Sequence, residues 1–379
     1  MSELPTELGD IRALYDGVLA SDIQIRTFRS SERLFPVREV VCGARVSTLP
    51  RRSTALPSIG FLSAGVRYDL VDYLALNRVT GLLVLKDGEV AGEDYAFGNT
   101  PQTRWISMSV VKTITATLVG AALHDGYIGS LDEAVTDYVR SLRGSAYEGV
   151  TIRQLLQMTS GVGWDETYTS ASSDRRRMLD AQIAQQPGGI LALMAGLPRV
   201  AAPGERWNYS TGETFVAGAL VQAAVGRTLC EYLSERIWVP MGMEAPATWW
   251  LESPGGMEIG GSGLGATLRD YGRFALFLLA DGVALGERIL PEGWLAAAAA
   301  PQWIGGQRVD YGYMVWPFAA APGSVNDGAF QALGIFGQHV YMNPHERVAI
   351  VVWGAQPKPN GKAPVVPADF FAAVTLALR

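Results

Sequence analysis

The chain has 379 residues, of which 48% are hydrophobic and only 18% charged, and its formal net charge is −6. This length and low charge require a large buried core, exclude a disordered chain, and allow two domains or one large composite unit. The acidic balance argues against a nucleic-acid or anionic-membrane partner. No apolar run approaches the ~18 residues that span a bilayer, and the acidic N-terminus lacks a signal-peptide pattern. We therefore expect a cytoplasmic protein.

Residues that commonly hold metals are scarce. There are three histidines (His124, His339 and His345) and two cysteines (Cys42 and Cys230), without His-Glu-x-x-His or Cys-x-x-Cys spacing. We expect no metal or other cofactor and no disulfide framework. The Gly-x-Ser-x-Gly elbow typical of one class of Ser-His-Asp hydrolases is also absent.

The first part of the chain predicts a helix and then a hairpin. A helix is expected at about residues 6–19, followed by an irregular stretch rich in Arg, Ser and Pro. Strand-like runs at 82–85 and 90–97 flank residues 86–89, whose Asp-Gly pair is a strong turn signal.

Helical periodicity dominates from Ser109 to about residue 301. The run 110–123 is apolar nearly all round, which is typical of a buried helix, and it stops at Asp125-Gly126. Thr151 and Gln154 form a capping box for a helix that ends near residues 160–161. Further helices are expected at 214–225, 269–280 and 291–299.

The C-terminal part returns to strands, at 338–342 and 347–353 around a turn at 343–346, and a last helix starts at Pro367. These elements predict an α/β (α+β) fold in which an antiparallel sheet, built from N- and C-terminal strands, is flanked by helices. We expect residues 1–104 and 301–379 to form the two parts of this α/β domain. Residues 105–300 would then be a mostly helical insertion.

A Ser-x-x-Lys pair, Ser109 and Lys112, opens the buried helix. Positions i and i+3 share one helix face, so the amine can reach the hydroxyl. Burial lowers the pKa of a lysine, and a neutral amine can take a proton from serine. The chain uses four Lys against 27 Arg, and only Lys112 lies inside an apolar helix. The pattern therefore favours a nucleophile and its base over a structural pair.

Two further features follow along the chain. Tyr209 lies in a polar loop before an apolar helix, where a phenol near an amine can carry a second proton, although packing is the commoner role of such a tyrosine. Gly334 and Gly337 stand three apart at a strand start, which indicates either a close backbone approach to a ligand or a simple bulge.

These motifs, in this order, resemble the serine β-lactamase and penicillin-binding-protein superfamily. The nearest likeness is to the class C-like branch with nylon-oligomer (6-aminohexanoate-dimer) hydrolases and family VIII carboxylesterases. The likeness extends from about Gly81 to Gly354 and includes residues 107–112 and 151–161. It implies a β-lactamase/transpeptidase-like fold.

The resemblance implies roles for individual residues. Ser109 would be the acyl-accepting nucleophile, Lys112 its base and Tyr209 the second-motif tyrosine. The backbone N–H groups of Ser109 and Ile335 would form an oxyanion hole. Residues 166–168 resemble the flap of nylon-oligomer hydrolases, which assigns Tyr168 to substrate binding; an exposed loop aromatic is the alternative.

The chain departs from β-lactamases in two motifs. It has Tyr209-Ser210-Thr211 in place of Tyr-x-Asn and Gly334-Ile335-Phe336-Gly337 in place of Lys-Thr/Ser-Gly. The Asn amide and the Lys cation that bind the amide and carboxylate of a β-lactam are therefore missing. We expect an uncharged acyl group to bind instead, at a site formed by Trp164, Tyr168, Trp207, Thr211, Gly334, Phe336 and Gly337.

The expected function is that of a serine hydrolase that forms an acyl-enzyme with a small linear amide or carboxylic ester. One alternative is a family VIII-type carboxylesterase with little amidase activity. Another is a catalytically silent β-lactamase-like binding protein. The expected partner is a small-molecule substrate, with no nucleic acid or membrane, and a homodimer is the oligomeric state we consider.

Overall fold

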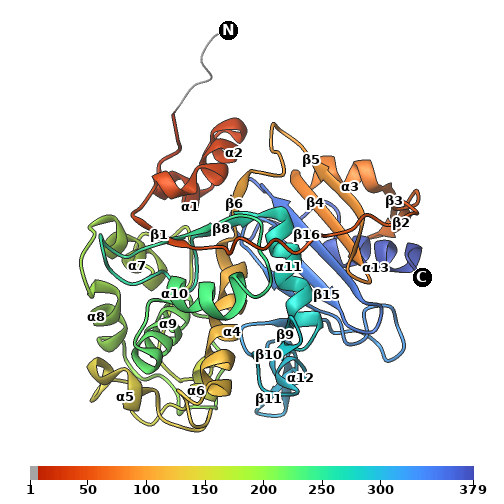
Figure 1. Ribbon diagram of the computed structural model, residues 1–379. Coiled ribbons are helices and arrows are strands. Elements are labelled where there is room, and N and C mark those ends of the chain that lie inside the picture. Colours follow the sequence, from red (N-terminus) through yellow and green to blue (C-terminus); the bar gives the residue numbers. More distant parts are fainter. Residues whose placement is uncertain (1–6) are drawn as a thin grey trace.

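The computed structural model describes residues 7–379, so the first residue of the helix expected at 6–19 lies outside the described residues. The largest sheet has six strands in the order β13-β14-β15-β16-β4-β5, and every neighbouring pair is antiparallel (Figure 1). Its strands are β4 (Val79–Lys86), β5 (Glu89–Tyr95), β13 (Trp316–Pro317), β14 (Phe330–Leu333), β15 (His339–Asn343) and β16 (Val348–Gly354). The predicted pairing of the early and late hairpins is confirmed, because β16 lies directly beside β4.

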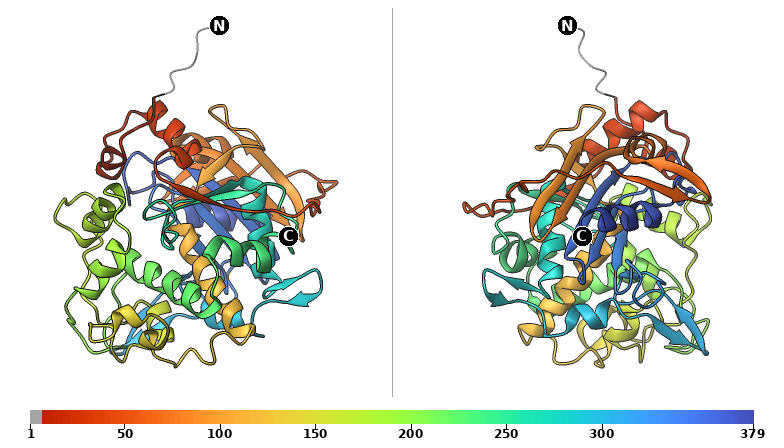
Figure 2. Two further views of the ribbon diagram at one scale, coloured as in Figure 1. Left: turned by 60° about the vertical axis from the view of Figure 1, so that its left-hand side comes forward. Right: turned by 90° about the vertical axis from the view of Figure 1, so that its right-hand side faces the viewer.

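Helices cover both faces of this sheet, which is why β4 and β16 are mostly apolar and are buried along almost their whole length. Residues alternate between the two faces, so that Leu83 and Val351 belong to one buried cluster and Val84 and Ile350 to the other. Helix α11 packs on the first face and α13 on the second (Figures 1 and 2).

The helical part is built around α4, which has buried residues on all sides and packs against α9. The helices are α1 (Ile11–Asp16), α2 (Ser21–Arg29), α3 (Leu70–Leu76), α4 (Val111–His124), α5 (Val135–Tyr138), α6 (Ile152–Leu156), α7 (Asp174–Ile183), α8 (Gly189–Ala195), α9 (Thr211–Val225), α10 (Leu229–Leu233), α11 (Leu268–Leu279), α12 (Trp294–Ala298) and α13 (Pro367–Ala377). Thr151 forms the predicted capping box with Gln154, but α6 ends before the predicted residues 160–161.

A second sheet was not predicted. It has four strands in the order β1-β7-β8-β6, which are β1 (Val37–Val40), β6 (Arg104–Ile106), β7 (Ala247–Trp250) and β8 (Leu264–Thr267). The prediction of helical periodicity throughout 109–301 is therefore wrong at β7 and β8. All eight residues of these two strands are buried, so the alternation that reveals a half-exposed strand is absent.

The N-terminal segment also differs from its prediction. Asp10 caps α1 and the left-handed Gly17 ends it, so this helix is shorter than expected. The stretch predicted to be irregular contains α2, which buries Ile25 and Phe28 on one side. The short hairpins pair β2 (Gly60–Ser63) with β3 (Val66–Asp69), β9 (Val283–Ala284) with β10 (Glu287–Arg288), and β11 (Gln302–Ile304) with β12 (Gln307–Val309).

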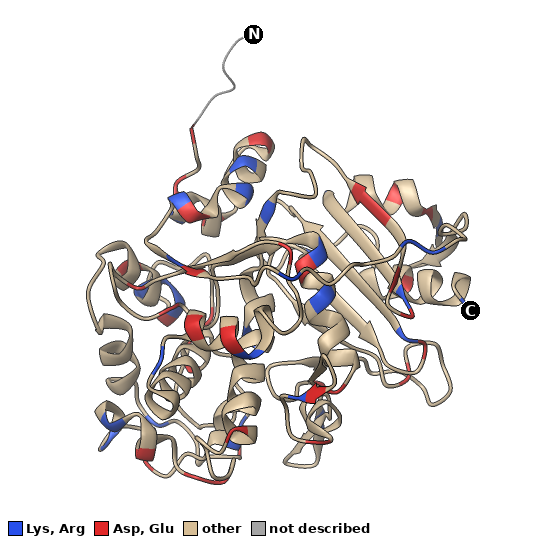
Figure 3. Ribbon diagram, in the orientation of Figure 1, with Lys and Arg blue, Asp and Glu red and all other residues tan. Residues whose placement is uncertain are grey.

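Charged residues of both signs are spread around the periphery, and β15 and β16 carry none (Figure 3). Within residues 7–379, no helix is both long and apolar enough to cross a bilayer.

Candidate active site

Ser109 lies in a single 3₁₀ turn, Met108–Val110, which runs directly into α4. The preceding Met108 has a φ of 47°, in the left-handed region that costs free energy for a residue with a side chain. The N–H of Ser107 donates to the carbonyl of Leu264 in β8 (2.8 Å), which holds this turn against the second sheet. Such strain next to one serine indicates a conformation that the surrounding structure enforces.

Lys112 lies in the first turn of α4, three residues after Ser109, and it is only 1% exposed. Its Nζ lies 3.1 Å from Ser109 Oγ, 2.9 Å from Thr211 Oγ1 and 3.0 Å from the carbonyl oxygen of Gly261. The structure thus brings Ser109 and Lys112 together, as the i, i+3 spacing predicts. A Cβ on Gly261 would lie 2.8 Å from Thr211 Cγ2 and 3.2 Å from Lys112 Nζ, so the pocket around the amine needs this glycine.

Burial lowers the pKa of Lys112 from 10.5 to about 7. The negative charge of Glu166 acts in the opposite direction, and the positive charge of Arg175 lowers the pKa further. Near neutral pH a large fraction of this lysine is therefore an uncharged amine with a free lone pair, which is the form that can accept a proton.

Tyr209 lies beside this pair, with Lys112 Nζ 5.1 Å from the centre of its ring. Two contacts fix its loop: the N–H of Asn208 donates to the carbonyl of Met158 (2.9 Å), and Ser210 caps α9 through the N–H of Glu213 (3.1 Å). Burial raises the pKa of Tyr209, the charge of Glu166 adds to this, and a hydrogen bond with Ser109 lowers it. The phenol therefore stays protonated and can donate a proton.

The segment 334–338 makes a tight turn beside the serine. The N–H of Gly334 donates to the carbonyl of Gln338 (2.8 Å), and the N–H of Gly337 donates to the carbonyl of Gly334 (3.1 Å). A Cβ on Gly334 would lie 2.8 Å from the carbonyl oxygen of Ser107, so only glycine lets this backbone approach the serine turn. Among the described residues, the N–H of Ile335 has no hydrogen-bond acceptor, and it is thus free for a substrate oxygen.

Phe336 does not lie as expected for a residue whose side chain lines the substrate site. Its side chain is fully buried and packs against Phe28, at 5.2 Å between ring centres, because the turn directs it into the core. Thr211 is also buried, and its hydroxyl contacts Lys112. Trp207 packs among Tyr209, Tyr311 and Trp316.

Trp164 and Tyr168 lie in the loop Trp164–Thr169, which we call the flap. Both side chains donate to the carboxylate of Glu166. A cavity of about 480 Å³ lies between the flap and a loop that follows β16, and it is lined by Glu166, Thr167, Tyr168, Thr169, Tyr209, Pro359 and Asn360.

Sequence reasoning missed three parts of this site. Glu166 was noted only as a neighbour of Tyr168, although its carboxylate lies at the centre of the flap. Pro359 and Asn360 contribute to the cavity wall, and no sequence signal places them there. The N–H of Asn360 donates to the carbonyl of Ile335 (2.8 Å), which links this loop to the segment beside the serine.

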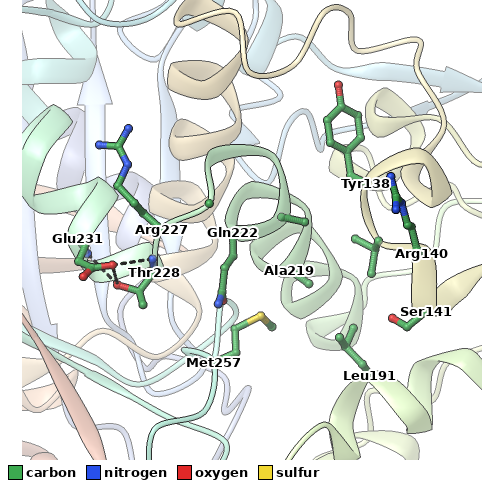
Figure 4. Close-up of a pocket in the computed structure, with 13 residues that line it drawn as sticks. Tyr138, Arg140, Ser141, Leu191, Ala219, Gln222, Arg227, Thr228, Glu231 and Met257 are labelled. Carbon is green, nitrogen blue, oxygen red and sulfur yellow. Dashed lines mark hydrogen bonds between the residues drawn. The ribbon is translucent and has the colours of Figure 1, made fainter.

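A larger cavity, of about 660 Å³, lies elsewhere, among α5, α8, α9 and α10 (Figure 4). Gln222, Arg227, Glu231 and Met257 contribute to its lining, and none of the predicted site residues does. Within residues 7–379, no group of three or more His, Cys, Asp or Glu side chains is arranged to hold a metal ion.

The family model described as "Beta-lactamase" matches residues 76–369. The chain belongs to the β-lactamase family. It is 28% identical, over 337 residues, to the 6-aminohexanoate-dimer hydrolase of Paenarthrobacter ureafaciens. This match covers 85% of this chain and 84% of the relative.

Solved structures share the fold. A Bacillus anthracis protein provisionally named as a 6-aminohexanoate-dimer hydrolase superposes with a TM-score of 0.85 at 21% identity, and the match covers 98% of both chains. A family VIII carboxylesterase superposes with a TM-score of 0.60 at 18% identity, over 77% of this chain and 91% of the esterase. The predicted resemblance to this branch of the superfamily is confirmed.

Proposed function

We propose that this protein is a serine hydrolase that forms an acyl-enzyme with a small linear amide or carboxylic ester. The observation that carries the proposal is the contact of 3.1 Å between Ser109 Oγ and a buried amine whose pKa is lowered to about 7. The relationship to a 6-aminohexanoate-dimer hydrolase over most of both chains supports an amide substrate.

In the first step, Lys112 takes the proton of Ser109 as the serine oxygen bonds to the substrate carbonyl carbon. The C=O electron pair moves onto the oxygen, which accepts hydrogen bonds from the N–H groups of Ser109 and Ile335. The bond to the leaving nitrogen or oxygen then breaks. Tyr209 donates a proton to that atom and is reprotonated by Lys112.

Water completes the reaction. It attacks the ester carbon of the acyl-enzyme and gives one proton to Lys112, the bond to Ser109 Oγ breaks, and the serine recovers its proton. The carboxylic acid leaves. An amine leaving group needs a proton more than an alcohol does, so Tyr209 should matter more for amides than for esters.

The flap cavity favours an uncharged acyl group or one that carries a cation. Its lining contains the carboxylate of Glu166 and no Lys or Arg. A carboxylesterase with little amidase activity remains the second candidate, because an ester needs less help at its leaving group.

One experiment tests the mechanism and another the substrate class. A fluorophosphonate probe should label the wild-type protein on Ser109, and Ser109→Ala should not be labelled; labelling elsewhere would reject the proposal. Comparing kcat/KM across p-nitrophenyl esters, 6-aminohexanoate dimer and D-amino-acid amides should then show turnover of a linear amide. Turnover of esters but not of amides would favour the second candidate, a carboxylesterase with little amidase activity.

A further inference from the structure

The carboxylate of Glu166 accepts four hydrogen bonds, two at each oxygen. Oε2 accepts from the N–H of Thr211 (2.8 Å) and from Trp164 Nε1 (2.5 Å). Oε1 accepts from the Tyr168 hydroxyl (2.8 Å) and from Thr211 Oγ1. Two of these donors belong to the flap and two to the first residue of α9. A single carboxylate therefore joins the flap to the helix that contacts Lys112.

The hydroxyl of Thr211 transmits this arrangement to the lysine. Its one proton points to Glu166, so its lone pairs are left to accept from Lys112 Nζ at 2.9 Å. An uncharged lysine has two N–H bonds and one lone pair. Thr211 and the carbonyl of Gly261 accept the two N–H bonds, which directs the lone pair towards Ser109 Oγ.

The charge of Glu166 also acts on the reacting groups. The charged or titratable side chains around Lys112 are Glu166 from the flap, Arg175 from α7 and Tyr209 from the loop before α9. Burial has the larger effect on Lys112 and lowers its pKa, whereas the charge of Glu166 raises it. It also adds to the increase that burial causes in the pKa of Tyr209.

We propose that Glu166 is a positioning residue, whose carboxylate orients the Lys112 amine through Thr211 and holds the flap closed through Tyr168. This inference rests on the proposed roles of Ser109 and Lys112. Because both tasks depend on one side chain, the amine is best aligned when the flap is in place over the cavity.

The sharpest test is Glu166→Gln, because glutamine has nearly the same shape. Its carbonyl oxygen can replace Oε2, where both partners are obligatory donors. Its NH₂ group can replace Oε1, where both partners are hydroxyls that can accept. The substitution removes the charge and reverses the bond to Thr211. The Thr211 proton is then free to point at the lone pair of Lys112 and compete with Ser109.

Two results are expected for Glu166→Gln when kcat, kcat/KM and the rate of fluorophosphonate labelling are measured as functions of pH. The maximum kcat should fall by about 10- to 100-fold, as for the loss of a charge-assisted hydrogen bond. The acidic limb of the pH profile of kcat/KM, where activity falls as Lys112 becomes protonated, should move to lower pH. The reason is that the substitution removes the negative charge that raises the pKa of Lys112. A residue that only supports the flap would not move this limb.

Three variants complete the test. Tyr168→Phe loses one flap bond but keeps the charge, so its acidic limb should stay in place while KM rises. Thr211→Val removes the hydroxyl between Glu166 and Lys112, so kcat should fall without the shift seen in Glu166→Gln. Glu205→Gln removes an exposed carboxylate whose described contact is the N–H of Ala202 (3.3 Å), and neither quantity should change.

The proposal is overturned if Glu166→Gln has the same kcat as the wild type and an acidic limb at the same pH. It is equally overturned if Tyr168→Phe reproduces the whole effect of Glu166→Gln. If Glu166→Gln does not fold, the kcat of Thr211→Val decides: a wild-type value contradicts the proposal and a loss supports it. These outcomes differ from failure of the proposed function, in which Ser109→Ala would still be labelled.

Discussion

Replacing Lys112 separates its proposed role as a base from a purely structural role. A lysine with its ordinary pKa of 10.5 is about 0.03% uncharged at pH 7, whereas one with a pKa of about 7 is about half uncharged. Burial in α4 thus raises the fraction of reactive amine by about 10³-fold. We expect Lys112→Met and Lys112→Arg each to lower kcat/KM by at least about 10²-fold, because methionine has no basic nitrogen and a guanidinium stays charged.

Stability measurements distinguish loss of a base from loss of the fold. The pKa of Lys112 is lower in the folded than in the unfolded protein, so the unfolded state binds more protons between about pH 7 and 10.5. In this range the contribution of Lys112 to the free energy of unfolding rises with pH, by at most about 1.4 kcal/mol per unit. This contribution is most unfavourable below about pH 7 and disappears above about pH 10.5.

Lys112→Met should lack this pH-dependent contribution and should have a Tm at pH 7 similar to or above that of the wild type, because it removes a buried cation. The assay is kcat/KM on a p-nitrophenyl ester together with chemical unfolding at pH 7 and pH 9. An active Lys112→Arg enzyme would refute the assignment, as would inactivity explained by unfolding in both variants.

Three other predictions concern neighbouring groups. Tyr209→Phe should lower kcat less than the Lys112 variants do, and more for an amide than for an ester; equal losses on both substrates would argue against proton donation to the leaving group. Nitrocefin should be hydrolysed about 10- to 150-fold less efficiently than p-nitrophenyl butyrate, because Gly334 stands where β-lactamases have a lysine that binds the substrate carboxylate. Comparable kcat/KM values for the two substrates would contradict this. Gly334→Ala should lower both kcat and Tm, since its Cβ would lie 2.8 Å from the carbonyl oxygen of Ser107, and a variant with unchanged kinetics would contradict the close approach.

Local sequence patterns predicted the parts of the site that lie on one element. Ser109 lies in the 3₁₀ turn that runs into α4 and Lys112 in the first turn of α4, and their proximity follows from this helical spacing of three residues. The strand-like runs that form β4 and β16 likewise indicated that the early and late hairpins belong to one antiparallel sheet. In both cases the relevant interactions lie within one element or between continuous apolar strands.

Features that depend on tertiary packing could not be predicted in this way. β7 and β8 are buried on both faces and show no alternation, so their sequence did not distinguish them from buried helix. Phe336 was placed in the site from its position in a motif, whereas the turn directs its ring into the core. The proposed role of Glu166 depends on Thr211, 45 residues away in the sequence, which folding places against its carboxylate.

The central claim is that Ser109 becomes acylated during turnover. The most direct measurement is to mix the protein with a p-nitrophenyl ester, quench in acid within the first turnovers, and locate the added mass by peptide mapping. The proposed mechanism predicts the mass of the acyl group on the peptide that contains Ser109, its disappearance as turnover ends, and no adduct in Ser109→Ala. Turnover without an acyl adduct under conditions that trap one in a known serine hydrolase, or an adduct on another residue, would contradict it.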